Sequence, residues 1–368
     1  MSKRLRIILA GVLFVIVGFL FVVILSPAKN LVLDPSAKPQ DDSATDTKTH
    51  TLLFAGDIML TRNVGKQISY HNDWRYPFLL IASTTRQADL AFANLESQIS
   101  SRGRNQGSIY SFRADPRVIE GLSYAGFDVL STVNNHSLDY GRDALVDTID
   151  LLKQAGIASV GTGRNTQEAN APYIATLGDT KIALLAYTSF YPESVRATAD
   201  SAGISSFVPE VVFAQIKELK TQADIIIVSF HAGDEYQTTS HPREQEIYRS
   251  FIDAGADLVI GHHPHVVQEI ERYEPSVPVV IASEGEAIQT APSTGLPRRL
   301  VAPRNDSESD KHFGYIAYSL GNFVFDQDFS EATMQGMMVE AVIKDKKIVE
   351  FNKIPIKLTP TFQPYLSE

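Results

Sequence analysis

Short apolar runs recur along the chain, and polar residues follow most of them. Runs of this length that are rich in β-branched and aromatic residues are typical of buried strands. They predict eight strands, at residues 52–55, 90–93, 127–131, 182–187, 225–230, 258–260, 277–281 and 315–320.

Amphipathic patterns of helical period lie between several of these runs and predict helices at residues 143–155, 209–220 and 242–254. The first stops before Gly156, and the other two begin with a proline, which suits a first-turn position. Alternating strands and helices predict an α/β fold with a largely parallel core. After residue 335 the pattern changes to two strands with a turn near Asp345, which predicts an antiparallel edge.

Residues 1–26 predict a membrane anchor. Three basic residues, Lys3, Arg4 and Arg6, precede an uncharged stretch at 7–25. As a helix it would measure roughly 28 Å, enough to span a bilayer. A cleavable signal peptide is the alternative, but its apolar region is usually shorter, and no small-x-small cleavage site follows here. The basic residues place the N-terminus in the cytoplasm, so we expect a single-pass protein with an extracytoplasmic domain.

Residues 27–50 are rich in Pro, Ser, Thr, Asp and Lys, and we interpret them as a flexible linker to one large domain at 51–360. The net charge of −10 argues against nucleic acid as a general partner. The absence of cysteine excludes thiolate zinc sites and cysteine nucleophiles. Residues 283–311 predict a long surface loop, whose arginines would either be solvated or meet an anionic substrate.

Residue types that bind metals stand where the predicted strands end. They are Asp57, Glu96, Asn135, His231, His263 and His265. In open α/β sheets, ligands gather at the carboxyl ends of strands. Neutral imidazole and carboxylate suit zinc, iron and manganese, and two such ions can activate a water for hydrolysis. The sequence therefore predicts a metal site, with enough ligands for two ions.

Three motifs sharpen this prediction. In FANLES, period-two alternation puts Asn94 and Glu96 on one face of a strand. In VNNHSLDYG, turn formation explains Asn134 and Asp139 but not His136, which would serve as a metal ligand or as a proton donor. GHHPHV, with three histidines in four residues, is the most specific of the motifs, because isolated histidines are usually structural.

The ordered motifs GDIML, NLE, NNHSLDYG, HAGDEY, GHHPHV and SLGNFVFD, between residues 51 and 327, resemble the CapA (PgsA-like) family of poly-γ-glutamate capsule biosynthesis proteins. That family is similar to the calcineurin-like metallophosphatases. The resemblance implies a four-layer αββα sandwich with two divalent ions, of Mn, Zn or Fe, at the strand ends. It implies one ion on Asp57, Glu96 and His265, another on Asn135, His231 and His263, and His136 as the catalytic acid. It also implies substrate or supporting contacts from Asn94, Asn134, Asp139, Glu235, His262 and Asn322.

Two residues depart from the metallophosphatase pattern. Met59 stands where a histidine ligand is usual, and Glu96 stands in place of a bridging aspartate. These departures put the first metal site in doubt.

The resemblance leads us to expect a membrane-anchored, metal-dependent hydrolase. It would act in synthesis or export of poly-γ-glutamate or a similar anionic surface polymer, together with other capsule subunits. A phosphoester and a γ-glutamyl substrate both remain open, because a fold alone does not define a reaction. The alternative is a non-catalytic polymer-binding or scaffold subunit, which Met59 favours.

Overall fold

The computed structural model describes residues 48–205, 207–275 and 312–367. The predicted anchor, the predicted strand at 277–281, the predicted loop at 283–311 and nearly all of the predicted linker lie outside these ranges. The described residues belong to one compact unit. Within the described ranges, no helix is long and apolar enough to cross a membrane.

The first sheet combines a parallel half with an antiparallel half. Its strand order is β18 (Pro364–Leu366), β17 (Lys347–Leu358), β16 (Gln335–Lys344), β1 (His50–Ile58), β2 (Leu90–Leu95), β5 (Val129–Ser131) and β6 (Ala158–Val160), and β15 (Asn322–Val324) also pairs with β1. β1, β2, β5 and β6 are parallel, whereas β16, β17 and β18 form an antiparallel meander. The turn between β16 and β17 lies at Asp345 and Lys346, which confirms the predicted antiparallel edge.

The second sheet has a parallel centre between two antiparallel edge strands. Its order is β13 (Ile270–Tyr273), β14 (Gly314–Ala317), β12 (Leu258–His262), β11 (Ile225–His231), β9 (Thr180–Thr188) and β8 (Tyr173–Leu177). Every predicted strand within the described residues coincides with a strand, although β14 ends three residues earlier than expected. The predicted α/β class is confirmed.

The longer helices are α1 (Arg62–His71), α3 (Ile119–Ala125), α4 (Arg142–Gln154), α6 (Pro209–Leu219) and α7 (Pro242–Ala254). The three predicted helices are confirmed within one residue at each end, as α4, α6 and α7, whereas α1 and α3 were not predicted. α7 starts with a capping box of His241 and Glu244 and ends at Gly255, whose φ of 115° suits a glycine. The short elements are η1 (Tyr76–Phe78), α2 (Ala82–Thr85), β3 (Gln98–Ile99), β4 (Arg113–Ala114), η2 (Pro116–Val118), β7 (Thr162–Gly163), α5 (Thr166–Ala169), η3 (Glu193–Val195), β10 (Gly203–Ile204) and η5 (Ala332–Met334).

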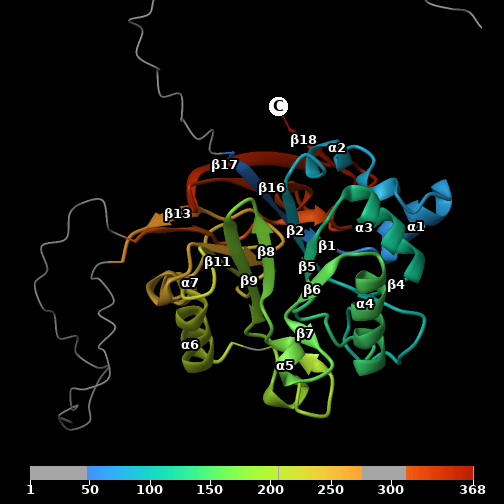
Figure 1. Cartoon of the computed structure of the whole chain (residues 1–368). Helices are drawn as coiled ribbons and strands as arrows, with labels where there is room; N and C mark the ends of the chain where they lie inside the picture. Colours follow the sequence, from blue (N-terminus) through green and yellow to red (C-terminus); the bar gives the residue numbers. More distant parts are fainter. Residues whose placement is uncertain (1–47, 206, 276–311, 368) are drawn as a thin grey trace, which may run out of the picture. The chain divides into compact units, whose positions relative to one another are not determined.

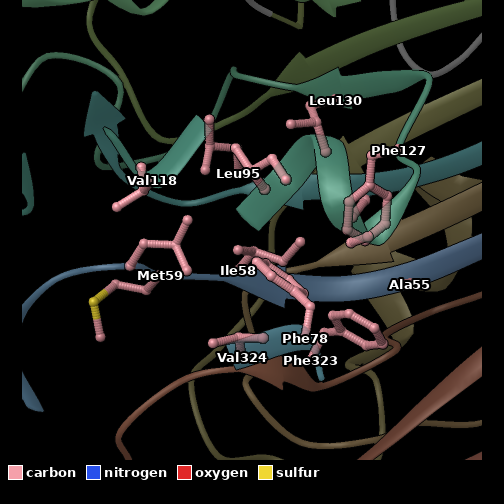
Figure 2. Close-up of a cluster of buried hydrophobic side chains, with 14 of the residues drawn as sticks. Ala55, Ile58, Met59, Phe78, Leu95, Val118, Phe127, Leu130, Phe323 and Val324 are labelled. Atoms are coloured by element: carbon pink, nitrogen blue, oxygen red, sulfur yellow. The ribbon is translucent and has the colours of Figure 1, made fainter. Parts of the chain in front are cut away.

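Three apolar clusters define four layers. One cluster lies between the two sheets and joins side chains such as Phe54 and Phe92 to Ile227 and Ile260. A second fills the outer face of the first sheet, beneath α1 and α3, and Figure 2 shows part of it. The third packs the second sheet against α6 and α7. The order helix, sheet, sheet, helix follows from these contacts (Figure 1).

Candidate metal centre

A β-bulge in β1 turns Asp57 towards the space between the sheets. Phe54 pairs with Phe92 and Asp57 pairs with Asn94, so β1 holds one more residue than β2 between these two pairs. Phe92 packs between the sheets, and Asn94 lies two residues further on the same face. Without the extra residue, alternation would aim Asp57 at the outer helices.

A close strand contact fixes the chain behind Asp57. A Cβ atom at Gly56 would lie 1.9 Å from the carbonyl oxygen of Gly321, so only glycine fits there. The backbone N–H of Asp57 donates to the same carbonyl at 3.0 Å. β1 and β15 pair here in parallel, with Asp57 opposite Asn322, which brings Asn322 to the centre.

Two histidines of the GHHPHV motif, His263 and His265, follow β12 in a strained turn. His263 and His265 have φ angles of 103° and 58°, which residues with a side chain rarely adopt. Their ring centroids lie 5.8 Å apart, and the ring of His231, at the end of β11, lies 5.0 Å from that of His263. The turn therefore aims two imidazoles at the end of the neighbouring strand.

The structure brings the predicted ligands together in two overlapping groups. One comprises Glu96, His263 and His265, and the other comprises Asp57, Glu96 and His231. All five residues are buried, and within each group the possible ligand atoms lie within 4.8 Å of one another. The resemblance instead joined His263 to His231, so the assignment of residues to individual ions stays a prediction.

The first group presents donor atoms without hydrogen-bond partners. Oε1 of Glu96 and Nδ1 of His263 are buried and have no partner among the described residues. Nδ1 of His265 lies 3.0 Å from Oδ1 of Asn322. The other ring nitrogen, Nε2, faces Glu96 and lies 3.6 Å from its Oε1. Unpartnered buried polar atoms are costly, and a divalent cation would satisfy all three. These residues fit a metal ion.

The electrostatics of the centre favour neutral imidazoles. Burial lowers the pKa of His231 well below its ordinary value, and burial beside other imidazoles lowers the pKa of His263 to about 3. Burial also lowers the pKa of His265. Burial and the nearby Asp57 raise the pKa of Glu96 well above its usual range, whereas contacts with His262 and His265 outweigh burial and hold the pKa of Asp57 low. The imidazoles are therefore neutral, and each ring has one nitrogen with a lone pair.

Met59 does not face the centre. Its side chain is buried in the outer apolar cluster with Ile58 and Val118, as Figure 2 shows. Its sulfur accepts hydrogen bonds from the backbone N–H and the hydroxyl of Thr61, at 3.1 and 2.8 Å. Met59 therefore contributes to packing. The residue two positions after Asp57, where the metallophosphatase pattern has a histidine ligand, does not supply a ligand here.

His136 forms a hydrogen-bonded pair with Asp139 beside the ligand cluster. Nδ1 of His136 lies 2.7 Å from Oδ2 of Asp139, which also accepts the backbone N–H of Phe112 at 2.7 Å. The opposite ring nitrogen of His136 lies 3.8 Å from Oε1 of Glu96. Asp139 thus fixes the ring so that Nε2 faces the centre, as expected for a proton donor or acceptor.

The other predicted residues surround this cluster. Asn135 places its amide oxygen 2.8 Å from Nε2 of His231. The amide of Asn134 bridges Asn94 and the backbone carbonyl of Leu95. His262 is buried with Nδ1 3.3 Å from Oδ1 of Asp57, and neither of its ring nitrogens has a hydrogen-bond partner among the described residues.

A cavity of about 220 Å³ opens beside His136 and His265. Glu235 and Arg62 both line it. The sequence reasoning missed Arg62, although a cation five residues after Asp57 at the start of a helix was a usable signal. Arg62 is paired with Asp326 and lies 5.1 Å from the ring centroid of Phe112. It is the one described residue lining the cavity that carries a permanent positive charge.

The protein is thus an α/β sandwich of two sheets with a candidate metal centre. The centre is a buried cluster of imidazoles and carboxylates at the strand ends. The chain belongs to the family described as bacterial capsule synthesis protein PGA_cap, whose model matches residues 51–327. This confirms the family resemblance that the ordered sequence motifs indicated.

Two curated relatives carry related descriptions. Capsule biosynthesis protein CapA of Bacillus anthracis is 27% identical over 84% of this chain and 67% of its own length. PGA biosynthesis protein CapA of Bacillus subtilis is 28% identical over 83% of this chain and 70% of its own length.

Solved structures with a similar arrangement are distant. A novel phosphatase of Mycoplasma pneumoniae shares 14% identity with a TM-score of 0.45, covering 84% of this chain and 94% of that chain. A 5'-nucleotidase precursor of Thermus thermophilus shares 13% identity with a TM-score of 0.43, covering 86% of this chain and 56% of that chain. Likenesses at this level support no statement about the reaction.

Proposed function

We propose that the protein is a membrane-anchored, extracytoplasmic, metal-dependent hydrolase that acts in synthesis or export of poly-γ-glutamate or a similar anionic polymer. The main support for hydrolase activity is the set of possible metal-ligand atoms on Glu96, His263 and His265, which lies beside the His136–Asp139 pair. The family and the two CapA relatives support the polymer. The order of strand-end motifs supports a fold of the metallophosphatase type.

A bound divalent ion would polarise a substrate oxygen and make a water more acidic. The chain itself supplies the remaining functions. Asp139 holds the ring of His136 so that its Nε2 can deliver a proton to a leaving group at the cavity. Arg62 lines the same cavity and would orient an anionic group of the substrate.

The negative charge around the cavity means that an anionic substrate would bind only after a metal ion has bound. Glu235 and Asp326 line it, against Arg62 as the single permanent cation among the described lining residues. A phosphate or a polyglutamate chain would be repelled by this excess of carboxylates until cations neutralise it. We therefore expect substrate affinity to depend on metal as strongly as turnover does.

Metal content and hydrolysis of the purified full-length protein test the proposal. We expect bound metal by elemental mass spectrometry and metal-dependent cleavage of a phosphodiester or of γ-linked glutamate oligomers. A variant with His263→Ala and His265→Ala should lose both. Metal without cleavage of either substrate class would contradict the hydrolase, and absence of metal after supply of Mn, Zn and Fe would contradict the centre itself.

A non-catalytic scaffold is the second candidate, and the packing of Met59 away from the centre favours it, because one ligand of the metallophosphatase pattern is missing. His136→Ala separates the two functions in cells. A scaffold should keep polymer production in this variant, whereas a hydrolase should lose most of it.

The membrane anchor at residues 1–26 is a separate part of the proposal, supported by the uncharged stretch and the basic residues before it. Fractionation and protease accessibility of intact cells test it. The domain should remain with the membrane fraction and be cleaved from outside. A cytoplasmic, protease-protected domain would overturn this arrangement and, with it, direct contact with an exported polymer.

A further inference from the structure

The side-chain amide of Asn94 lies in the middle of the second ligand group. Its Nδ2 is 2.8 Å from Oδ1 of Asp57, 3.3 Å from Oε2 of Glu96 and 3.2 Å from Nδ1 of His231. Asn94 is fully buried. Three of the atoms that would bind an ion therefore surround one amide nitrogen.

The direction of this amide is fixed by the side chain of Asn134, three residues beyond β5. The amide oxygen of Asn134 accepts the backbone N–H of His136 at 3.0 Å, and its Nδ2 donates to the carbonyl of Leu95 at 2.9 Å. The same Nδ2 lies 3.1 Å from Oδ1 of Asn94, which must therefore be an acceptor. The NH2 group of Asn94 is then left to face Asp57, Glu96 and His231.

This orientation uses the lone pair of His231. An amide NH2 group can only donate, so Nδ1 of His231, which faces it at 3.2 Å, is the ring nitrogen with the lone pair. Nε2 then carries the hydrogen and donates to the amide oxygen of Asn135 at 2.8 Å. A neutral imidazole has one lone pair in its plane, so His231 in this network has none left for a metal.

The first ligand group is in the opposite condition. Oε1 of Glu96 and Nδ1 of His263 have no hydrogen-bond partner among the described residues, and Nε2 of His265 faces Glu96. The two groups share Glu96 but use different oxygens of its carboxylate: Oε2 meets Asn94, and Oε1 lies near His265. The atoms of Asp57, Glu96 and His231 that face Asn94 are thus occupied by its amide, whereas Oε1 of Glu96 and Nδ1 of His263 are open to a cation.

We propose that the centre binds a single divalent ion, through Glu96, His263 and His265, and that the amide of Asn94 takes the place of a second ion between Asp57, Glu96 and His231. The two-ion site implied by the metallophosphatase resemblance does not fit these residues. This inference rests on the proposed metal centre but not on the hydrolytic reaction, so a one-ion protein without hydrolase activity leaves it intact.

Metal stoichiometry in Asn94→Asp tests the proposal directly. The change is nearly isosteric and replaces the NH2 donor with a carboxylate oxygen, so the new carboxylate would repel Asp57 and Glu96 until a cation enters. The full-length protein should bind one equivalent of Mn²⁺ or Zn²⁺, and Asn94→Asp should bind two. Magnetic coupling between two Mn²⁺ ions in electron paramagnetic resonance should appear in the variant alone. Asn352→Asp makes the same change on the exposed side of β17 and should keep one equivalent.

Two stoichiometries would overturn the proposal. Two equivalents in the unaltered chain would show that Asn94 does not exclude an ion, and one equivalent in a folded Asn94→Asp protein would show that another feature does. If Asn94→Asp does not fold, ligand deletions in the unaltered chain decide the matter. His231→Ala should keep the single ion with an affinity changed by less than threefold, whereas His265→Ala should weaken it by more than tenfold. Loss of the ion from His231→Ala would overturn the proposal.

Discussion

Nε2 of His265 lies 3.6 Å from Oε1 of Glu96, although the two residues follow strands of different sheets, β12 and β2. An ion held by both would join the sheets at their open ends. Because such an ion binds only the folded chain, it should stabilise the fold by about 2.7 kcal/mol when its concentration is a hundred times the dissociation constant. Thermal unfolding of the metal-free full chain, with and without added Mn²⁺, measures this. His265→Ala should show a clearly smaller rise in unfolding temperature with Mn²⁺, and a metal response equal to that of the unaltered chain would contradict the bridge.

Asn322 should set the metal affinity through its contact with His265. Its amide oxygen lies 3.0 Å from Nδ1 of His265 and fixes the ring with Nε2 towards Glu96. Partners of this kind typically contribute a factor of roughly 10 to 100 in affinity. Titration of Zn²⁺ into Asn322→Ala should show a loss of that size, and Asn322→Asp, which keeps an acceptor oxygen, should lose much less. Equal affinity in Asn322→Ala and the unaltered chain would mean that the contact does not orient the ring.

Asp139 should act on turnover and leave substrate binding nearly unchanged. Its carboxylate orients His136 without lining the cavity. On the proposed hydrolase, Asp139→Asn should lower kcat by at least tenfold, within the range attributed to general acid catalysis, with little change in KM or metal content. Asp143→Asn makes the same change at an exposed position of α4 and should behave as the unaltered enzyme. A rise in KM at unchanged kcat would contradict the role of the pair.

The metal-free protein should lose stability as the pH falls. His231, His263 and His265 have lowered pKa values, to about 3 for His263, so they stay neutral in the folded state while the unfolded chain takes up protons below about pH 6.5. Glu96 has the opposite effect, because its raised pKa makes the folded state take up a proton at a higher pH than the unfolded chain does. This cancels the contribution of one histidine. Two protons remain, and their effect is roughly 3 kcal/mol per pH unit at most, between about pH 6 and pH 4.

Thermal unfolding between pH 8 and pH 4.5 in the presence of a chelator checks this dependence. The unfolding temperature should be nearly constant above pH 7 and fall steeply below pH 6. The variant His263→Ala with His265→Ala should show a shallower fall. A midpoint independent of pH across this range would contradict the burial of neutral imidazoles.

Arg62 should contribute to stability through a buried partner. Asp326 accepts hydrogen bonds from Arg62 and from the backbone N–H of Asn63, and its side chain is only 1% exposed. Arg62→Ala would leave that carboxylate unpaired, at a cost of about 2 to 3 kcal/mol, less than for a fully buried pair because Arg62 is one-third exposed. Adding Asp326→Asn should recover most of the loss in denaturant unfolding. A double variant less stable than Arg62→Ala would show that the charge is not the cause.

The alternation of strands and helices was predictable because each apolar run is short and ends in turn-forming residues. β13 was not predicted, since Ile270 to Tyr273 mixes charged and apolar residues on an edge strand that is only partly buried. The residues of the centre were predictable from their places at strand ends. Their geometry was not, because it depends on long-range contacts that no local pattern encodes.

Two details show this limit. β12 ends at His262, and a strained turn beyond the strand orients the rings of His263 and His265, which strand alternation does not encode. Met59 was interpreted as a replaced ligand, whereas its side chain packs in the outer cluster. The hydrogen bonds that orient Asn94 join three strands and a turn, and only the folded chain brings them together.

The extra residue in β1 makes the centre sensitive to chain length as well as to residue identity. Removing one residue between Phe54 and Asp57 would keep every donor type in the sequence, yet Asp57 would turn towards the helices and its contacts with Asn94 and His262 would be lost. Single-residue gaps at this point in related sequences therefore mark chains that retain the fold and all the motifs but not the centre. Such a gap would pass unnoticed in any comparison that counts matching residues alone.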